Sequence, residues 1–97
     1  MNIQDFEFRF TFIKFADKEN KVGIFFYPLS KGGLKGGMIT TLPDGNEMGA
    51  EYEVKMKDGN LYIGWMDIEF LFTETKLGFD LINDTGAKAY SFIRPVQ

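Results

Sequence analysis

Residues 47–65 read EMGAEYEVKMKDGNLYIGW, and this stretch decides the fold. Before Asp58-Gly59 apolar residues alternate with charged residues or glycine, which is the pattern of a strand with one buried and one exposed face. Asp-Gly between two such runs is typical of a two-residue type I′ hairpin turn. That turn predicts three opposed pairs: Met56 with Leu61, Val54 with Ile63, and Tyr52 with Trp65.

Beyond Trp65 the alternation changes phase. Continuing on the same face would bury Asp67 and Glu69, whereas residues 68, 70 and 72 now form the apolar set. We therefore expect a bend or bulge over residues 64–67 within one long strand. Turns over residues 73–76 and 83–86 then predict a strand over 87–94 and these contacts: Phe72 with Leu77, Phe70 with Phe79, Ile68 with Leu81, and Tyr90 and Phe92 with Phe79 and Leu77.

Toward the N-terminus the period of two also occurs. Phenylalanine occupies positions 6, 8, 10 and 12 with polar residues between them, which predicts a first strand that continues through Phe15. A turn over residues 17–20 leads to a return strand over 21–27, and this places Phe12 opposite Phe25 and Phe10 opposite Tyr27. No segment shows a helical period, so we expect no substantial helix.

Residues 30–37 contain four glycines and a duplicated Lys-Gly-Gly. Glycine weakens strand and helix interiors, so we expect a flexible connector here, with an anion-binding nest of backbone N–H groups as the alternative. A short strand over residues 38–42 follows. It ends at Pro43-Asp44-Gly45-Asn46, a sequence that favours a turn.

Seven to eight short antiparallel strands joined mostly by hairpins form an up-and-down meander. With 97 residues the chain has room for a single all-β domain over residues 1–97. The meander must close or fold over to cover its apolar face, so the sequence predicts a small barrel or a two-sheet sandwich. Eleven Phe, four Tyr and Trp65 supply the large side chains of its core.

The composition argues against catalysis. The chain has no His and no Cys, so it lacks the usual general base near neutral pH, the strongest nucleophile and the best zinc ligands. We expect no enzyme activity, no cofactor and no metal. Asp67 and Glu69 share a strand face near Trp65, as a glycosidase or a cation site would need, but we interpret them as facing water.

The N-terminus predicts a cytoplasmic protein. Asp5 and Glu7 lie where a secretory signal would need basic residues and then an apolar stretch. No apolar run approaches the roughly 20 residues that span a bilayer, so we expect no membrane partner. A net charge of −3 argues against nucleic acid as a partner.

Charge distribution supplies the first functional hypothesis. Residues 1–38 carry six bases and four acids, whereas residues 44–80 carry nine acids and three bases. An acidic surface on a domain without catalytic groups predicts an inhibitor or adaptor that binds a protein partner, a basic one in particular. Phage anti-defence proteins and toxin-immunity proteins have this general character. The expected contact residues are Glu47, Glu51, Glu53, Asp67 and Glu69.

The alternative hypothesis is a carrier of a small hydrophobic ligand. The surplus of aromatic side chains would line the interior of a barrel and hold the ligand there. The expected ligand-binding residues are Tyr52, Trp65, Lys31 and Lys35. Under either hypothesis, unpaired edge strands would allow a homodimer.

Overall fold

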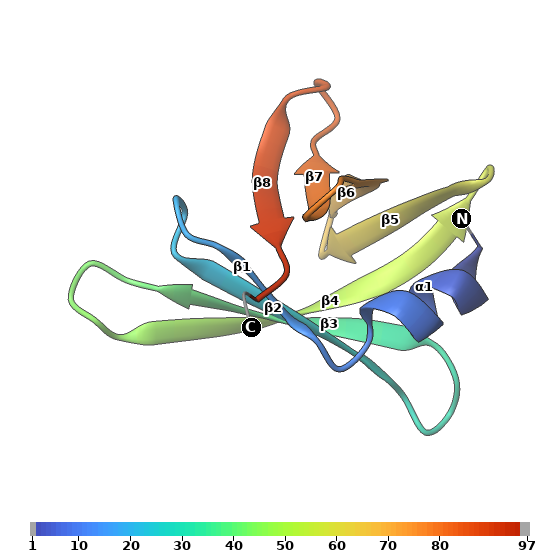
Figure 1. Ribbon diagram of the computed structural model, residues 1–97, viewed down its shortest axis with the longest axis horizontal. Coiled ribbons are helices and arrows are strands. Elements are labelled where there is room, and N and C mark those ends of the chain that lie inside the picture. The colour runs from blue at the N-terminus through green and yellow to red at the C-terminus, as the bar shows by residue number, and fades with distance from the viewer. Residues whose placement is uncertain (1, 96–97) are drawn as a thin grey trace.

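The computed structural model describes residues 2–95, which form one short helix and eight strands (Figure 1). In chain order these are α1 (Ile3–Phe10), β1 (Lys14–Asp17), β2 (Val22–Pro28), β3 (Leu34–Thr41), β4 (Glu47–Lys57), β5 (Asn60–Trp65), β6 (Ile68–Glu74), β7 (Gly78–Ile82) and β8 (Lys88–Ile93). Each strand pairs antiparallel with its sequence neighbours, and β8 returns to β1 through Ala16 and Ile93. The fold is a closed all-β barrel, which confirms the predicted class and decides between barrel and sandwich.

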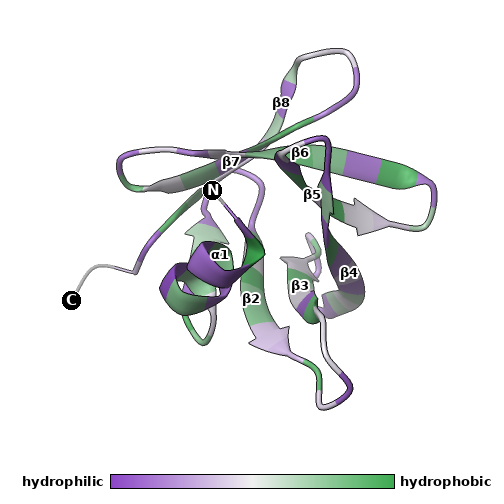
Figure 2. Cartoon of the chain, turned by 90° about the vertical axis from the view of Figure 1, so that its right-hand side faces the viewer, coloured by the Kyte–Doolittle hydropathy of each residue, from purple (hydrophilic) through white to green (hydrophobic). Residues whose placement is uncertain are grey.

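The two walls of the barrel meet on β4. Residues 47–52 of this strand pair with β3, residues 54–57 pair with β5, and Glu53 has a partner on both sides, Lys35 and Gly64. One wall therefore comprises β1 to β4 and the other β4 to β8, and Figure 2 shows the second crossing above the first. This sandwich-like closure explains why the sequence pattern fitted both architectures.

The β4–β5 hairpin confirms the central prediction from the sequence. Asp58 and Gly59 have φ angles of 52° and 82°, as a type I′ turn requires. Met56 lies opposite Leu61 and Val54 lies opposite Ile63. The Tyr52 and Trp65 rings, just beyond the paired residues, have centroids 6.0 Å apart. The turn and the alternation thus specify the same register.

The N-terminal strand prediction is wrong, because residues 3–10 form α1. Asn2 caps this helix, and its side-chain oxygen accepts the Asp5 N–H at 2.8 Å. Phe6 and Phe10 are four residues apart, so they share the buried face of the helix, whereas Phe8 is 90% exposed. The predicted strand pairing fails, since Lys14 lies opposite Phe25, although the Phe12 and Phe25 rings do contact each other, with centroids 6.0 Å apart.

The helix closes one end of the barrel with aromatic rings. Phe6 contacts Phe26 and Phe72 edge-on, with centroids 4.9 and 5.2 Å away. Phe10 contacts Phe72 at 5.2 Å and Phe79 at 6.0 Å. An eight-stranded barrel is only wide enough for side chains to fill its interior, and here phenylalanine fills it.

The glycine-rich segment is a connector, as predicted, only over its first half. Its turn ends at Gly33, and β3 begins at Leu34 rather than Met38. Gly36 lies within β3 under the Phe26 ring, where a Cβ atom would be 2.9 Å from ring atom Cε1. Glycine is required there because the buried ring passes so close to the backbone.

Residues 60–74 form a hairpin rather than one bent strand. A two-residue turn at Met66-Asp67 separates β5 from β6, and Trp65 pairs with Ile68. The turn predicted over residues 73–76 lies later, over 75–77, so the predicted pairings of β6 and β7 are wrong: Phe72 lies opposite Leu81 and Glu74 opposite Phe79. Phe92 lies opposite Phe79 and Tyr90 opposite Leu81, two residues away from the predicted pairing. The turns predicted over residues 43–46 and 83–86 are confirmed, and the turn predicted over 17–20 is found one residue later, over 18–21.

Candidate functional site

Three apolar side chains lie exposed at the end of the β5–β6 hairpin. Trp65 is 40%, Met66 83% and Ile68 50% exposed, and we call these three residues the tip patch. Met66 has φ 56°, a left-handed conformation that a bulky residue adopts rarely and at some cost. The two-residue turn imposes this conformation, and it leaves the methionine side chain in solvent.

Charged side chains line a hollow beside Trp65 and Met66 of the tip patch. Four of the five predicted contact acids line one hollow of about 500 Å³, in which Trp65 and Met66 also take part. The structure therefore brings together residues that the sequence places on two different strands. These acids are Glu51, Glu53, Asp67 and Glu69.

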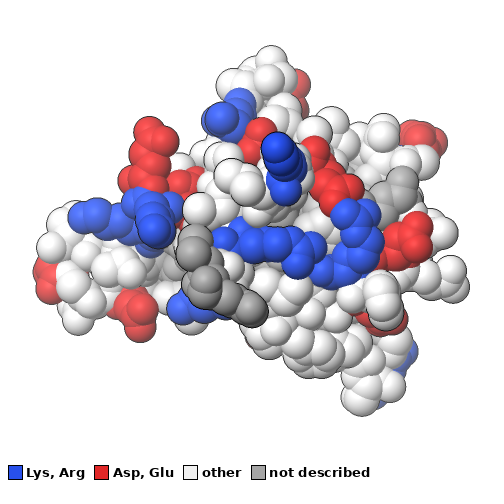
Figure 3. All heavy atoms as spheres, viewed as in Figure 1, with Lys and Arg blue, Asp and Glu red and all other residues white. Residues whose placement is uncertain are grey.

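Three lysines form ion pairs with three of these acids. Lys35 pairs with Glu51 at 3.2 Å and Lys55 with Glu53 at 3.4 Å. Lys57 hydrogen-bonds Glu69, which lowers the pKa of the carboxyl group and raises the pKa of the ammonium group. The hollow thus carries four acids against three lysines, so its charge is mixed. Figure 3 shows similar mixing of basic and acidic side chains on the face that Figure 1 presents.

Glu47 lies apart from the other four acids. It is four residues before Glu51 on β4 and lines a separate hollow of about 240 Å³ with Lys14, Lys18 and Lys21. Within residues 2–95, Glu47 and Asp67 take part in no ion pair.

The predicted ligand-binding residues do not form one site. Tyr52 is buried beside Trp65, and burial, followed by the charge of Tyr90, raises the pKa of its hydroxyl group. Lys35 belongs to the charged hollow, and Lys31 lies in the exposed turn between β2 and β3. Only Tyr52 and Trp65 are in contact as that hypothesis requires.

A groove that the sequence did not predict crosses the outer surface of β1–β4. Its volume is about 830 Å³, and its lining includes Phe25, Ile39 and Trp65. Gly23, Gly37 and Gly49 form part of its floor, because the wall has no side chains at these outward positions. The alternation of the sequence places these glycines on the outer face, but only the observed register shows that they adjoin one another.

The buried ionisable group, Asp17, is hydrogen-bonded to other parts of the fold. Among residues 2–95, Asp17 is the only charged side chain that is buried, and it accepts hydrogen bonds from Asn20 and Ser91. Burial raises its pKa, but the hydrogen bonds outweigh burial and hold the pKa below the usual value. In the same residues, no group of three or more His, Cys, Asp or Glu side chains is arranged to hold a metal ion.

The helix found in residues 2–95 is too short and too polar to cross a membrane. The chain matches no protein-family model, and it finds no match among curated proteins or among solved structures.

Proposed function

We propose that this protein is a non-catalytic, cytoplasmic binding domain that acts as an inhibitor or adaptor, and that the tip patch is the centre of its contact with a protein partner. The exposure of Trp65, Met66 and Ile68 at one hairpin end is the observation that carries the proposal. Exposed aromatic and methionine side chains at the centre of a polar rim are typical of protein interfaces, and tryptophan is prominent among their energetic hot spots.

The charged hollow, which forms a rim beside the tip patch, supports recognition of a partner that carries charges of both signs. Lys35, Lys55 and Lys57 already hold three of the acids in fixed positions, while Asp67 is without an ion pair within residues 2–95. Rim charges of this kind chiefly affect the rate of association and the choice of partner, and added salt screens them. We therefore expect association to slow as salt rises, while the apolar centre keeps the complex together.

The interior of the barrel gives no support to a carrier with its ligand inside. Phe6, Phe10, Phe26, Phe79 and Phe92 are at most 1% exposed, and their rings contact one another. The outer groove is the observation that keeps a small-molecule role as second candidate. Its volume of about 830 Å³ is in the range usual for small-molecule sites, about 300–1,000 Å³.

Affinity capture with matched variants tests the protein-binding proposal. We would immobilise the wild-type chain, a Trp65→Ala/Met66→Ser variant and a Phe8→Ala variant, and compare what each retains from a native lysate. Phe8 is 90% exposed on α1, so its removal controls for loss of any exposed apolar side chain. A partner retained in equimolar amount by the wild type and Phe8→Ala, and lost by the tip variant, is the expected result. Equal retention by all three would contradict the proposal.

A further inference from the structure

The outer face of β1–β4 carries a pattern that the proposed function uses only at Glu51, which lines the hollow beside the tip patch. Cross-strand pairing arranges its outward residues in rows that run from β1 to β4. One row reads Lys14, Phe25, Gly37, Glu51, and the next reads Ala16, Gly23, Ile39, Gly49. In the middle of each row a large apolar side chain lies next to a glycine. The first row also begins with a positive charge and ends with a negative charge.

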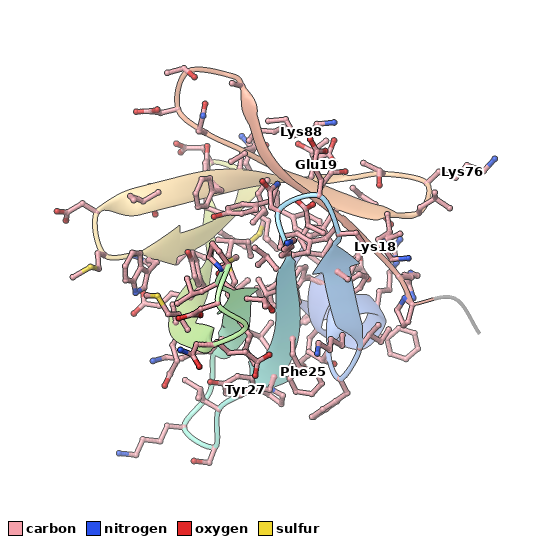
Figure 4. All side chains as sticks on the ribbon, turned by 90° about the vertical axis from the view of Figure 1, so that its left-hand side faces the viewer. Lys18, Glu19, Phe25, Tyr27, Lys76 and Lys88 are labelled. Atoms are coloured by element: carbon pink, nitrogen blue, oxygen red, sulfur yellow. The ribbon has the colours of Figure 1, made fainter. Side chains whose placement is uncertain are left out.

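These side chains are available at the surface. Phe25 is 38% and Ile39 42% exposed, whereas the inward residues Ile24 and Met38 on the same strands are buried. The glycines between them leave the groove of about 830 Å³. Figure 4 shows Phe25 and Tyr27 close together along β2, and their ring centroids are 6.4 Å apart. The face therefore presents apolar projections and recesses of similar size side by side.

We propose that this face binds a second copy of the chain around a two-fold axis that lies between β2 and β3, parallel to the strands. Rotation around this axis places β1 of one copy over β4 of the other and β2 over β3. Each row of one copy then lies over the same row of the other. Phe25 would then lie over the partner's Gly37, Ile39 over the partner's Gly23, and Lys14 over the partner's Glu51. Phe25 meets the recess at Gly37, Ile39 meets the Lys14 side chain that lies over Gly23, and each charge meets its opposite.

The charges of Lys14 and Glu51 favour this axis over one that runs perpendicular to the strands. An axis in the same plane but perpendicular to the strands would place Lys14 over the partner's Lys14 and Glu51 over the partner's Glu51. Within one copy the two residues lie three strand spacings apart, about 14 Å, so they cannot pair with each other. Glu51 pairs with Lys35 of its own chain at 3.2 Å, and a second copy in the first orientation adds Lys14 beside this pair.

The expected dimer is reversible. Four strands about 4.8 Å apart give a face narrower than a standard interface needs, so association should depend on concentration. The three proposed contacts avoid Trp65, Met66 and Ile68, but Glu51 also lines the charged hollow beside them, so the dimer and a partner bound at that hollow would compete for Glu51.

Sedimentation velocity from about 10 μM to 1 mM tests the dimer, because the chain has a mass of 11.1 kDa and its dimer twice that. We would compare the wild type with Lys14→Glu and Glu51→Lys, each alone and in an equimolar mixture. Glu7→Lys and Lys76→Glu are the controls, since both residues are off this face. Figure 4 shows Lys76 on a different hairpin from Phe25. Thermal melts would confirm that every variant folds.

We expect the wild type and both controls to dimerise, and each charge reversal to weaken the dimer at least tenfold. The mixture should form a heterodimer, because one contact then joins the two substituted residues with opposite charges and the other is the wild-type pair of Lys14 and Glu51. A wild type that stays monomeric throughout the range would overturn the proposal, and would leave the groove to a small ligand or another protein. A dimer that both reversals leave intact, or a mixture that restores nothing, would overturn it as well.

Discussion

The carboxylate of Asp17 accepts the main-chain N–H of Ser91 at 2.9 Å, and this bond connects β1 to β8. The two strands share a single residue pair, Ala16 and Ile93, so this hydrogen bond adds a second link across the seam. The same carboxylate accepts the Asn20 side-chain N–H at 2.8 Å and the Asn20 main-chain N–H at 3.1 Å. One buried side chain thus stabilises both the β1–β2 turn and the closure of the sheet.

Asp17→Asn should therefore destabilise the fold. A hydrogen bond to a charged group contributes about 1.5–3 kcal/mol, and a neutral amide cannot replace every bond that the carboxylate accepts. We expect the free energy of unfolding in urea to fall by about that amount. Ser91→Ala is the matched control, because it removes the side-chain bond to Asp80 and leaves the main-chain donor in place. Equal losses in the two variants would contradict the role of Asp17.

The pH dependence follows from the lowered pKa of Asp17. A carboxyl group whose pKa is lower in the folded than in the unfolded state stabilises the fold above its unfolded pKa, about 3.9. That stability is lost as the pH falls from about 4 through the folded pKa. The stability difference between wild type and Asp17→Asn should hence be constant from pH 5 to 7 and shrink below pH 4. A constant difference down to pH 2 would show that the charge contributes nothing.

Removal of one aromatic ring from α1 tests its role in closing the barrel. Phe6 is fully buried among other rings, so Phe6→Ala should cost about 3–5 kcal/mol. Phe8→Ala, two residues away and 90% exposed, should change stability by less than about 0.5 kcal/mol. Chemical denaturation of both variants measures the contrast. Similar losses at positions 6 and 8 would indicate a strand-like environment instead of a helix.

Two adjacent glycines in β3 should respond oppositely to alanine. A Cβ atom at Gly36 would be 2.9 Å from the buried Phe26 ring, so Gly36→Ala should cost about 1–3 kcal/mol. At Gly37 the nearest atom, Tyr27 Cε1, is 3.8 Å away, and alanine should be neutral or slightly stabilising. Thermal melts of the two variants make the comparison. A tolerated Gly36→Ala would show that the segment is as adaptable as its glycine content suggests.

The β4–β5 hairpin could be predicted because two independent local signals agree. Alternation gives the buried face, and Asp58-Gly59 gives the turn, so the register follows without tertiary information. The N-terminal segment lacked such agreement. Phenylalanine at positions 6 and 10 satisfies both a period of two and the spacing of one helix face. Local helix signals were present in the N-cap Asn2, in Asp5 of the first turn and in Arg9 of the last, but the alternating phenylalanines outweighed them in the prediction.

The candidate site was predictable in part. Strand faces placed Glu51 and Glu53 together, but the β5–β6 turn that brings Asp67 and Glu69 near them contains no glycine, asparagine or proline. Gly36 likewise has no local signature, since its role depends on Phe26 from the neighbouring strand. What escaped sequence reasoning in each case was a contact between strands, not a property of one strand.

Site-specific photo-crosslinking tests the proposed partner contact most directly. A benzophenone-bearing amino acid would replace Met66, and in separate chains it would replace Phe8 or Leu77, which are 83%, 90% and 64% exposed respectively. Irradiation in cells that make the protein should join position 66 to one partner protein of defined mass, with no such product from positions 8 and 77. The same product from all three positions, or none from position 66, would contradict binding through the tip patch.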